Sequence, residues 1–158
     1  MGDTLGTVDY QERLRVPLRW WAQITMLLAT LWLAFIIATP AWLAWTVSGV
    51  LLGFAYGVLA WIGAARVRVA HGVLYAGAAH ISARHLGEIV ALDKEATREL
   101  LGVGADARAY LLTRPYLKRS VRVQITDPAD PTPYWVIGTR RPAELASAIN
   151  AARAEVLG

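Results

Sequence analysis

The sequence contains no cysteine. This absence excludes disulfides, thiolate metal sites and a cysteine nucleophile, although it is silent about the cellular compartment. Charge is also missing from one long segment, because no Asp, Glu, Lys, Arg or His occurs between Trp20 and Ala65. Such a stretch is unusual outside lipid, and a hydrophobic fraction of 56% is high for a soluble globule.

The uncharged segment predicts two membrane-spanning helices, Trp20–Ala38 and Trp42–Ala64. Pro40 lies between them, where a helix must stop and the chain reverse, so the pair is expected to form an antiparallel hairpin. A cleaved signal peptide fits less well, because the first apolar stretch is too long and a second follows at once. A buried hairpin in a soluble protein would need a larger domain around it.

Basic residues on both sides of the predicted hairpin indicate its orientation. Arg13, Arg15 and Arg19 precede it, Arg66 and Arg68 follow it, and the connecting turn has no positive charge. The positive-inside rule then puts both termini in the cytoplasm. We therefore expect a multi-pass protein of the inner cell membrane, with the lipid bilayer as a partner.

The second predicted helix carries a repeated G-x-x-x-G pattern at Gly49, Gly53 and Gly57. Such a groove lets two helix backbones approach closely in lipid. The favoured interpretation is packing against the chain's own first helix. The alternative is self-association or docking on a membrane-protein partner.

After the hairpin the pattern changes to strands and short helices. "RVRVA" and "VLYA" around His71-Gly72 predict a strand, a tight turn and a second strand. Asp93 is expected to cap a short helix that ends at Gly102, and Pro142 to begin a closing amphipathic helix. Further strands are expected within "AHISARHLGEIVAL", "ARAYLLT", "SVRVQIT" and "YWVIGT".

A proline-rich loop, "DPADPTP", joins the last two expected strands. Its prolines stiffen the chain, and aspartate favours turn geometry. A structural turn is therefore favoured over a carboxylate pair for acid–base work or for a divalent cation. On the surface, such a stiff loop predicts a pre-ordered contact site, whose candidate interaction residues are Asp127, Asp130, Tyr134, Trp135, Arg140 and Arg141.

A basic cluster beside Tyr116 predicts contact with anionic lipid headgroups, at about 1 kcal/mol for each charge. The net charge of +4 agrees with an anionic neighbour. The alternative is a solvated basic face that follows the positive-inside bias. Nucleic acid is not an expected partner, because no nucleic-acid module is recognisable. The candidate headgroup contacts are Arg114, Lys118, Arg119 and Arg122.

No constellation for catalysis, metal binding or cofactor binding is recognisable. His71, His80 and His85 match no common metal spacing, and the sequence has neither a phosphate-binding glycine loop nor a nucleophile elbow. We therefore expect no metal, no cofactor and no enzymatic activity. The alternative is a small membrane-bound hydrolase or transferase that uses Asp127, Asp130 or His85.

The string "RPYLKRSVRVQITDPADPTPYWVIGTRRP" resembles an uncharacterised family of two-helix membrane proteins from high-GC actinobacteria, known only as a domain of unknown function. The likeness starts at "YQERLRVPLRWW" and covers nearly the whole chain, with "DPADPTPYW" and "TRRP" its most specific parts. Tyr116 and Gly138 stand where the family pattern often has Trp and Ser. The arrangement is also similar to bacterial pleckstrin-homology-like membrane proteins, which implies an antiparallel sheet, a closing C-terminal helix and a binding or assembly role.

Together these patterns predict three parts in the chain. They are a cytoplasmic N-terminal segment at 1–19, a two-helix transmembrane hairpin at 20–65 and a small cytoplasmic α+β domain at 66–158. The expected function is that of a membrane-tethered, non-catalytic interaction or assembly module at the inner membrane.

Overall fold

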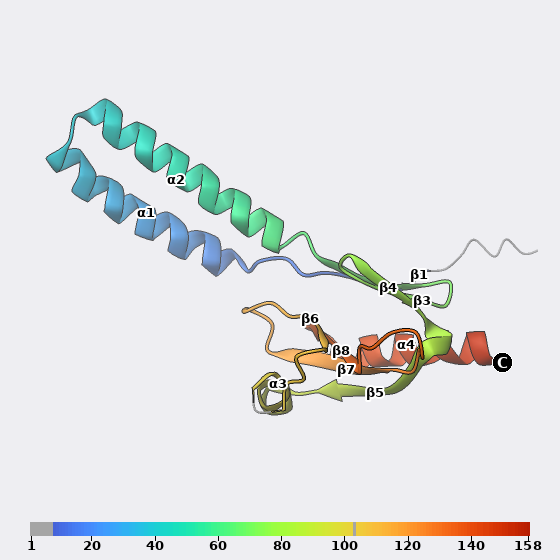
Figure 1. Cartoon of the computed structure of the whole chain (residues 1–158). Helices are drawn as coiled ribbons and strands as arrows, with labels where there is room; N and C mark the ends of the chain where they lie inside the picture. The colour runs from blue at the N-terminus through green and yellow to red at the C-terminus, as the bar shows by residue number, and fades with distance from the viewer. Residues whose placement is uncertain (1–7, 103) are drawn as a thin grey trace, which may run out of the picture. The chain divides into compact units, whose positions relative to one another are not determined.

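The computed structural model describes every residue except 1–7 and 103, and the chain falls into two compact units. Residues 15–65 form the helical unit. Residues 8–14 join residues 66–158 in the sheet unit. In chain order, the helical unit is therefore an insertion between the first and second strands of the sheet unit (Figure 1).

The strand β1 (Val8–Arg13) belongs to the sheet unit. The predicted boundary, a separate N-terminal segment at 1–19, is therefore corrected for residues 8–14, whereas residues 1–7 lie outside the described residues. Strand β1 pairs antiparallel with β2 (Arg66–Ala70), and Arg13 lies opposite Arg66. Because these two strands flank the insertion in the chain, their pairing holds both ends of the hairpin at one place in the sheet unit.

Helices α1 (Leu18–Ala38) and α2 (Ala41–Ile62) make up the helical unit and confirm the predicted hairpin. Pro40 immediately precedes α2, as its effect on helices predicts. The hydroxyls of Thr25 and Tyr56 share a hydrogen bond of 2.7 Å between the helices. By length and composition, both helices are able to cross a membrane.

The first sheet is antiparallel, with the order β1-β2-β3-β4, where β3 is Val73–Ala76 and β4 is Ala79–Ser82. The predicted tight turn between β2 and β3 is confirmed. His71 and Gly72 have φ angles of 52° and 66°, and a two-residue type I′ turn requires both to be positive. The face turned to the core carries Val67, Val69, Leu74, Ala76 and Ile81.

The second sheet has the order β5-β7-β8-β6. Strands β5 (Leu86–Leu92), β7 (Arg119–Ile125) and β8 (Tyr134–Thr139) are antiparallel neighbours, whereas β6 (Tyr110–Leu112) pairs parallel to β8. The parallel pair corrects the prediction of an antiparallel sheet. The chain reverses after β6 and again after β7, so β6 and β8 run in the same direction when they become neighbours.

Helices α3 (Lys94–Leu101) and α4 (Pro142–Leu157) confirm the two helices predicted after the hairpin. The Asp93 side chain caps α3 by accepting a hydrogen bond of 2.8 Å from the Ala96 backbone N–H. Helix α4 contacts β1 and β2 as well as β5 and β7, so it packs on both sheets (Figure 1). Its buried residues are Leu145, Ala146, Ile149 and Ala152.

Replacing Gly72 by alanine is expected to destabilise the sheet unit by about 2 kcal/mol. Gly72 has a φ of +66°, and a Cβ atom there would lie 2.3 Å from Cγ2 of Val156 on α4. Gly77→Ala is the matched control, because Gly77 has the same φ but its nearest heavy atom would be 3.2 Å away. Thermal unfolding of the full chain in neutral detergent measures both losses. Equal losses would contradict the contact with Val156.

Candidate functional site

The proline-rich loop between β7 and β8 is closed by its own aspartates. Asp127 accepts a hydrogen bond of 2.9 Å from the Ala129 backbone N–H, and Asp130 accepts one of 2.9 Å from that of Thr132. Hydrogen bonds from the side chain and backbone of Thr132 hold the pKa of Asp130 below its usual value. A carboxyl group with a lowered pKa is a weak base at neutral pH. The geometry therefore favours the turn role over an acid–base pair.

His85 anchors the same loop. Its Nδ1 lies 3.5 Å from Oδ2 of Asp127, and its Nε2 accepts a hydrogen bond of 2.7 Å from Nε of Arg84. Among the described residues, no hydroxyl group hydrogen-bonds to this imidazole, and no three His, Asp or Glu side chains form a group that could hold a metal ion. The described contacts of His85 are those of a loop anchor.

Trp135 is not part of an exposed contact surface. Only 4% of the residue is exposed, and its ring packs against that of Tyr110 with the centroids 5.0 Å apart. The neighbouring Tyr134 hydroxyl accepts a hydrogen bond of 3.0 Å from the Asp106 backbone N–H. Trp135 therefore does not belong to the candidate interaction surface, because β8 is an inner strand of its sheet and is buried from Trp135 to Thr139.

Arg140 and Arg141 also lie away from the loop. The loop is at the Tyr134 end of β8, whereas Thr139 pairs with Arg119 at the other end. Strand residues advance by about 3.4 Å each, so the two ends of β8 are roughly 17 Å apart. The six candidate interaction residues therefore do not form one surface. Arg140 lies near Tyr116 instead, and Arg141 lies over the Tyr10 ring and pairs with Glu144.

The basic cluster lies beside the place where the chain leaves the sheet unit for α1. The Tyr116 hydroxyl donates a hydrogen bond to the Leu14 carbonyl, and only Arg15–Pro17 separate Leu14 from α1. Burial raises the pKa of Tyr116, whereas the positive charges of Arg114 and Arg140 act to lower it. Both guanidinium groups are therefore close to this hydroxyl and to Leu14.

Arg122 stands apart from the other basic residues. Its guanidinium group lies over the Tyr134 ring, 5.4 Å from the centroid, in a cation–π contact. Its Nε atom is buried and has no hydrogen-bond partner among the described residues. Arg122 is therefore a residue of the sheet face, although the sequence placed it with the headgroup contacts.

A buried carboxylate that the sequence analysis did not single out joins β1 to the end of β8. Glu12 is 5% exposed, and its carboxylate accepts hydrogen bonds from the hydroxyls of Tyr10 and Thr139 and from the Arg140 backbone N–H. Burial, as the largest cause, raises the pKa of Tyr10 to about 12, so the phenol keeps its proton and can donate. Arg141 lies over the Tyr10 ring, 5.4 Å from its centroid. We call Glu12, Tyr10 and Thr139 the Glu12 cluster.

The three glycines of α2 do not pack against α1. A Cβ atom built on Gly49, Gly53 or Gly57 would meet no atom within 4 Å. Close packing at these glycines is therefore not seen in the helical unit, although Gly49 lines a groove together with residues of α1. Self-association or docking of a partner helix on these glycines stays a prediction.

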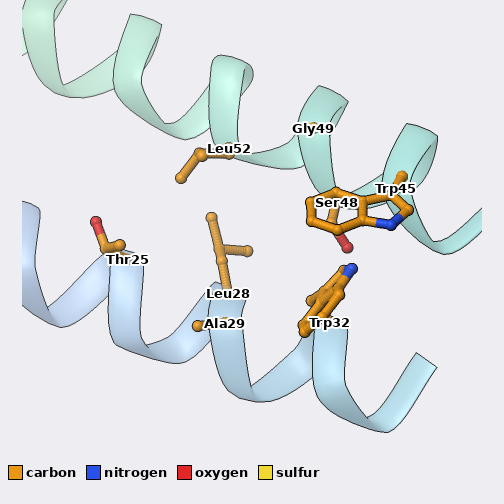
Figure 2. A pocket seen from close by; sticks show the side chains of 8 residues that line it. All are labelled: Thr25, Leu28, Ala29, Trp32, Trp45, Ser48, Gly49 and Leu52. Atoms are coloured by element: carbon orange, nitrogen blue, oxygen red, sulfur yellow. The ribbon is translucent and has the colours of Figure 1, made fainter. Parts of the chain in front are cut away.

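A groove of about 270 Å³ lies along the helical unit. Trp32 and Trp45 flank one end of it, with ring centroids 4.9 Å apart, and Leu28 and Leu52 face each other further along (Figure 2). Nε1 of Trp32 is buried and has no hydrogen-bond partner among the described residues. The groove suits an apolar group, because no charged side chain lines it.

A protein-family model, described as a protein of unknown function (DUF3093), matches residues 9–149. The chain belongs to this family. The DUF3093 match starts in β1 and ends in α4, so it includes the hairpin and both sheets. No curated protein and no solved structure matches the chain.

The strings "DPADPTPYW" and "TRRP", both inside the matched residues 9–149, lie at opposite ends of β8. "DPADPTPYW" forms the loop and the start of the strand, and "TRRP" follows at the end that meets the Glu12 cluster. Both strings have a structural role. The aspartates of the first close its own turn, and the Thr139 hydroxyl and the Arg140 backbone N–H of the second donate hydrogen bonds to the Glu12 carboxylate. The spacing of Tyr10 and Glu12 in "DYQER" puts both side chains on one face of a strand. This alternation is the sequence pattern that could have indicated the Glu12 cluster.

Proposed function

We propose that this DUF3093 protein is a membrane-tethered, non-catalytic binding module whose sheet unit contacts anionic lipid headgroups. The hairpin spans the inner membrane with both termini in the cytoplasm. The sheet unit then stays within a few residues' reach of the bilayer surface, because strands β1 and β2 lead directly into and out of the hairpin.

The observation that carries the proposal is the hydrogen bond from Tyr116 to Leu14. It attaches the connection between β6 and β7 to the last residue before the short link to α1. A fully extended chain spans at most about 3.5 Å per residue, so Leu14 cannot be far from the first residue of the helix. Residues that contact Leu14 are therefore the residues of the sheet unit that a headgroup can reach.

The basic residues close to Tyr116 in the sequence are suited to anionic headgroups. Lys118 and Arg119 are exposed, and no ion pair to an acidic side chain is found for either among the described residues. Nε of Arg114 is also buried, and no hydrogen-bond partner for it is found in the part of the chain that the structure describes. Each basic residue near an anionic surface contributes about 1 kcal/mol, so a few of them hold the unit at the membrane.

We further propose that the sheet unit is pleckstrin-homology-like. Two features support this: an antiparallel sheet, β1 to β4, is followed by a second sheet, and a C-terminal helix packs on both. The parallel pair of β6 and β8 departs from a wholly antiparallel pattern. A binding or assembly role in such a module needs no catalytic group, which fits the use of Asp127 and Asp130 as turn-closing residues.

A fluorescence experiment on the full chain tests the headgroup contact. Because the chain has no cysteine, Pro115→Cys and Ala129→Cys each introduce a unique labelling site, at the basic cluster and at the proline-rich loop. Both residues are exposed. In nanodiscs, we expect an environment-sensitive dye at position 115 to respond when phosphatidylglycerol is added to phosphatidylcholine. The response should fade with salt, whereas a dye at position 129 should respond little.

Two pairs of variants, one in the basic cluster and one elsewhere, test whether the charges of the cluster cause the response at position 115. Arg114→Gln with Arg119→Gln should shift the docking equilibrium by about 2 kcal/mol, or roughly thirtyfold. Arg84→Gln with Arg108→Gln removes the same charge from exposed positions elsewhere and should have little effect. A response at position 115 that is the same in neutral and anionic nanodiscs would count against the proposal.

A further inference from the structure

A second basic feature of the sheet unit is a cleft between α3 and the connection that precedes β7. Its volume is about 370 Å³. Lys94 and Arg98 lie one helical turn apart on α3, and Lys118 comes from the connection. The rest of the lining is Thr97, Leu101, Gly102 and Leu117.

The three positive charges of this cleft are not compensated by acidic side chains. None of the residues that line it is acidic. Among the described residues, the ion pairs involve His85, Arg108 and Arg141, and none involves Lys94, Arg98 or Lys118. Cations gathered around one hollow repel each other, and an anion placed between them would remove that repulsion.

The walls of the cleft add an apolar component. Leu101 and Leu117 contribute hydrocarbon surface, and lysine and arginine stems also pack along apolar surface while their charged ends reach outward. The one hydroxyl in the lining, that of Thr97, already hydrogen-bonds to Ser120 at 3.0 Å. An anion in this cleft therefore meets both charged groups and hydrocarbon surface.

We propose that this cleft binds the phosphate group of an amphipathic organic phosphate, with Lys94, Arg98 and Lys118 around the phosphate and the two leucines against its organic part. Arginine and lysine both bind phosphate, and the volume lies within the ordinary range for small-ligand pockets. The same chemistry is offered by a soluble organic phosphate and by the phosphate of a lipid headgroup.

This inference goes beyond the proposed function and does not rest on it. Lys94 and Arg98 belong to α3 and take no part in the contact with Leu14. Variants of these two residues therefore test the cleft, whereas variants of Arg114 and Arg119 test the membrane contact. Each proposal can fail without the other.

Backbone amide NMR shifts of the full chain in neutral detergent provide the test. Phenyl phosphate is the soluble probe, phosphatidic acid in the micelle is the lipid probe, and inorganic phosphate is the comparison without an organic part. We expect saturable shifts at Thr97, Leu101 and Leu117 with phenyl phosphate, phosphatidic acid or both. Binding only the first indicates a soluble ligand, and binding only the second indicates a lipid.

Paired variants decide whether the cleft is the site. Lys94→Gln with Arg98→Gln should weaken binding by at least about tenfold, because two charge-assisted contacts are lost. Arg84→Gln with Arg108→Gln, which removes the same charge elsewhere, should bind as the unaltered chain does. If the cleft double variant does not fold, Lys94→Gln alone, at an exposed position that only the cleft uses, takes its place.

Three results would overturn the inference. The first is the absence of saturable shifts at the cleft with both organic probes. The second is unchanged binding by the cleft variants, or an equal loss in the control pair. The third is inorganic phosphate binding as tightly as phenyl phosphate, because the leucine walls would then contribute nothing to recognition.

Discussion

Trp135→Ala is expected to lower the free energy of unfolding of the sheet unit by about 3–5 kcal/mol. The residue is 4% exposed, lies opposite Val123 in β7, and packs against the Tyr110 ring. Removing the indole leaves a cavity between the two central strands and the parallel edge strand. Amide hydrogen exchange of β7 and β8 measures this loss separately from the helices of the hairpin.

Two comparisons make the Trp135 prediction specific. Trp135→Phe keeps an aromatic ring in the same place, so the loss should fall to about 1–2 kcal/mol. Tyr75→Ala removes an aromatic side chain from β3, where the residue is 38% exposed, and should cost clearly less than Trp135→Ala. A Trp135→Ala variant that folds with nearly unchanged stability would restore Trp135 as a candidate contact residue beside the loop.

Glu12→Ala is expected to destabilise the sheet unit by about 3 kcal/mol. The substitution leaves the hydroxyls of Tyr10 and Thr139 and the Arg140 backbone N–H without their acceptor in a buried place. The effect should appear as faster amide exchange in β1 and at the end of β8, because the carboxylate joins these two elements. Glu12→Gln keeps an acceptor oxygen and should cost less, about 1–2 kcal/mol.

A double-mutant cycle separates the Glu12 cluster from a general loss of charge. Glu12→Ala and Thr139→Val should be strongly non-additive, because both remove the same hydrogen bond. Glu144→Ala is the control, since the Glu144 side chain is 59% exposed and forms an ion pair with Arg141 on the surface. Its cost should stay below about 0.5 kcal/mol. Additive losses in the cycle would show that the Glu12 cluster does not act as a unit.

The Glu12 cluster connects stability to the proposed membrane role. The cluster joins β1, the last strand before the hairpin, to the end of β8. Arg140 of "TRRP" directly follows that end. Tyr116 donates its hydrogen bond to Leu14, two residues after Glu12 in the chain. If the cluster is removed, we expect the basic residues near Leu14 to lose their fixed position, so the response of the dye at position 115 to anionic lipid should weaken as well.

Much of the chain could be predicted from short-range patterns. The absence of charge between Trp20 and Ala65 predicted both long helices, and Pro40 predicted their break. His71-Gly72 predicted the turn between β2 and β3, because positive φ angles suit few residue pairs. These features are decided within a few residues of sequence, where helix period, strand alternation and turn chemistry act directly.

The errors all involve partners distant in the sequence. Strand β1 pairs with β2, although the whole hairpin lies between these strands in the chain. The residues "VDYQER" do not indicate which strand they pair with. Burial of Trp135 depends on the position of β8 between β7 and β6 and on the contact with the Tyr110 ring, and the six residues of the strand do not indicate these neighbours.

The sequence by itself determined the hairpin, the tight turn, the capped helix α3 and the closing helix α4, because each depends on local spacing. Only the tertiary structure decided that Glu12 is buried against Thr139, that Arg140 and Arg141 lie away from the proline-rich loop, and that Lys94 and Arg98 share a cleft with Lys118. Those contacts depend on strand order and register, which are set by the packing of both sheets on α4 and not by any short segment.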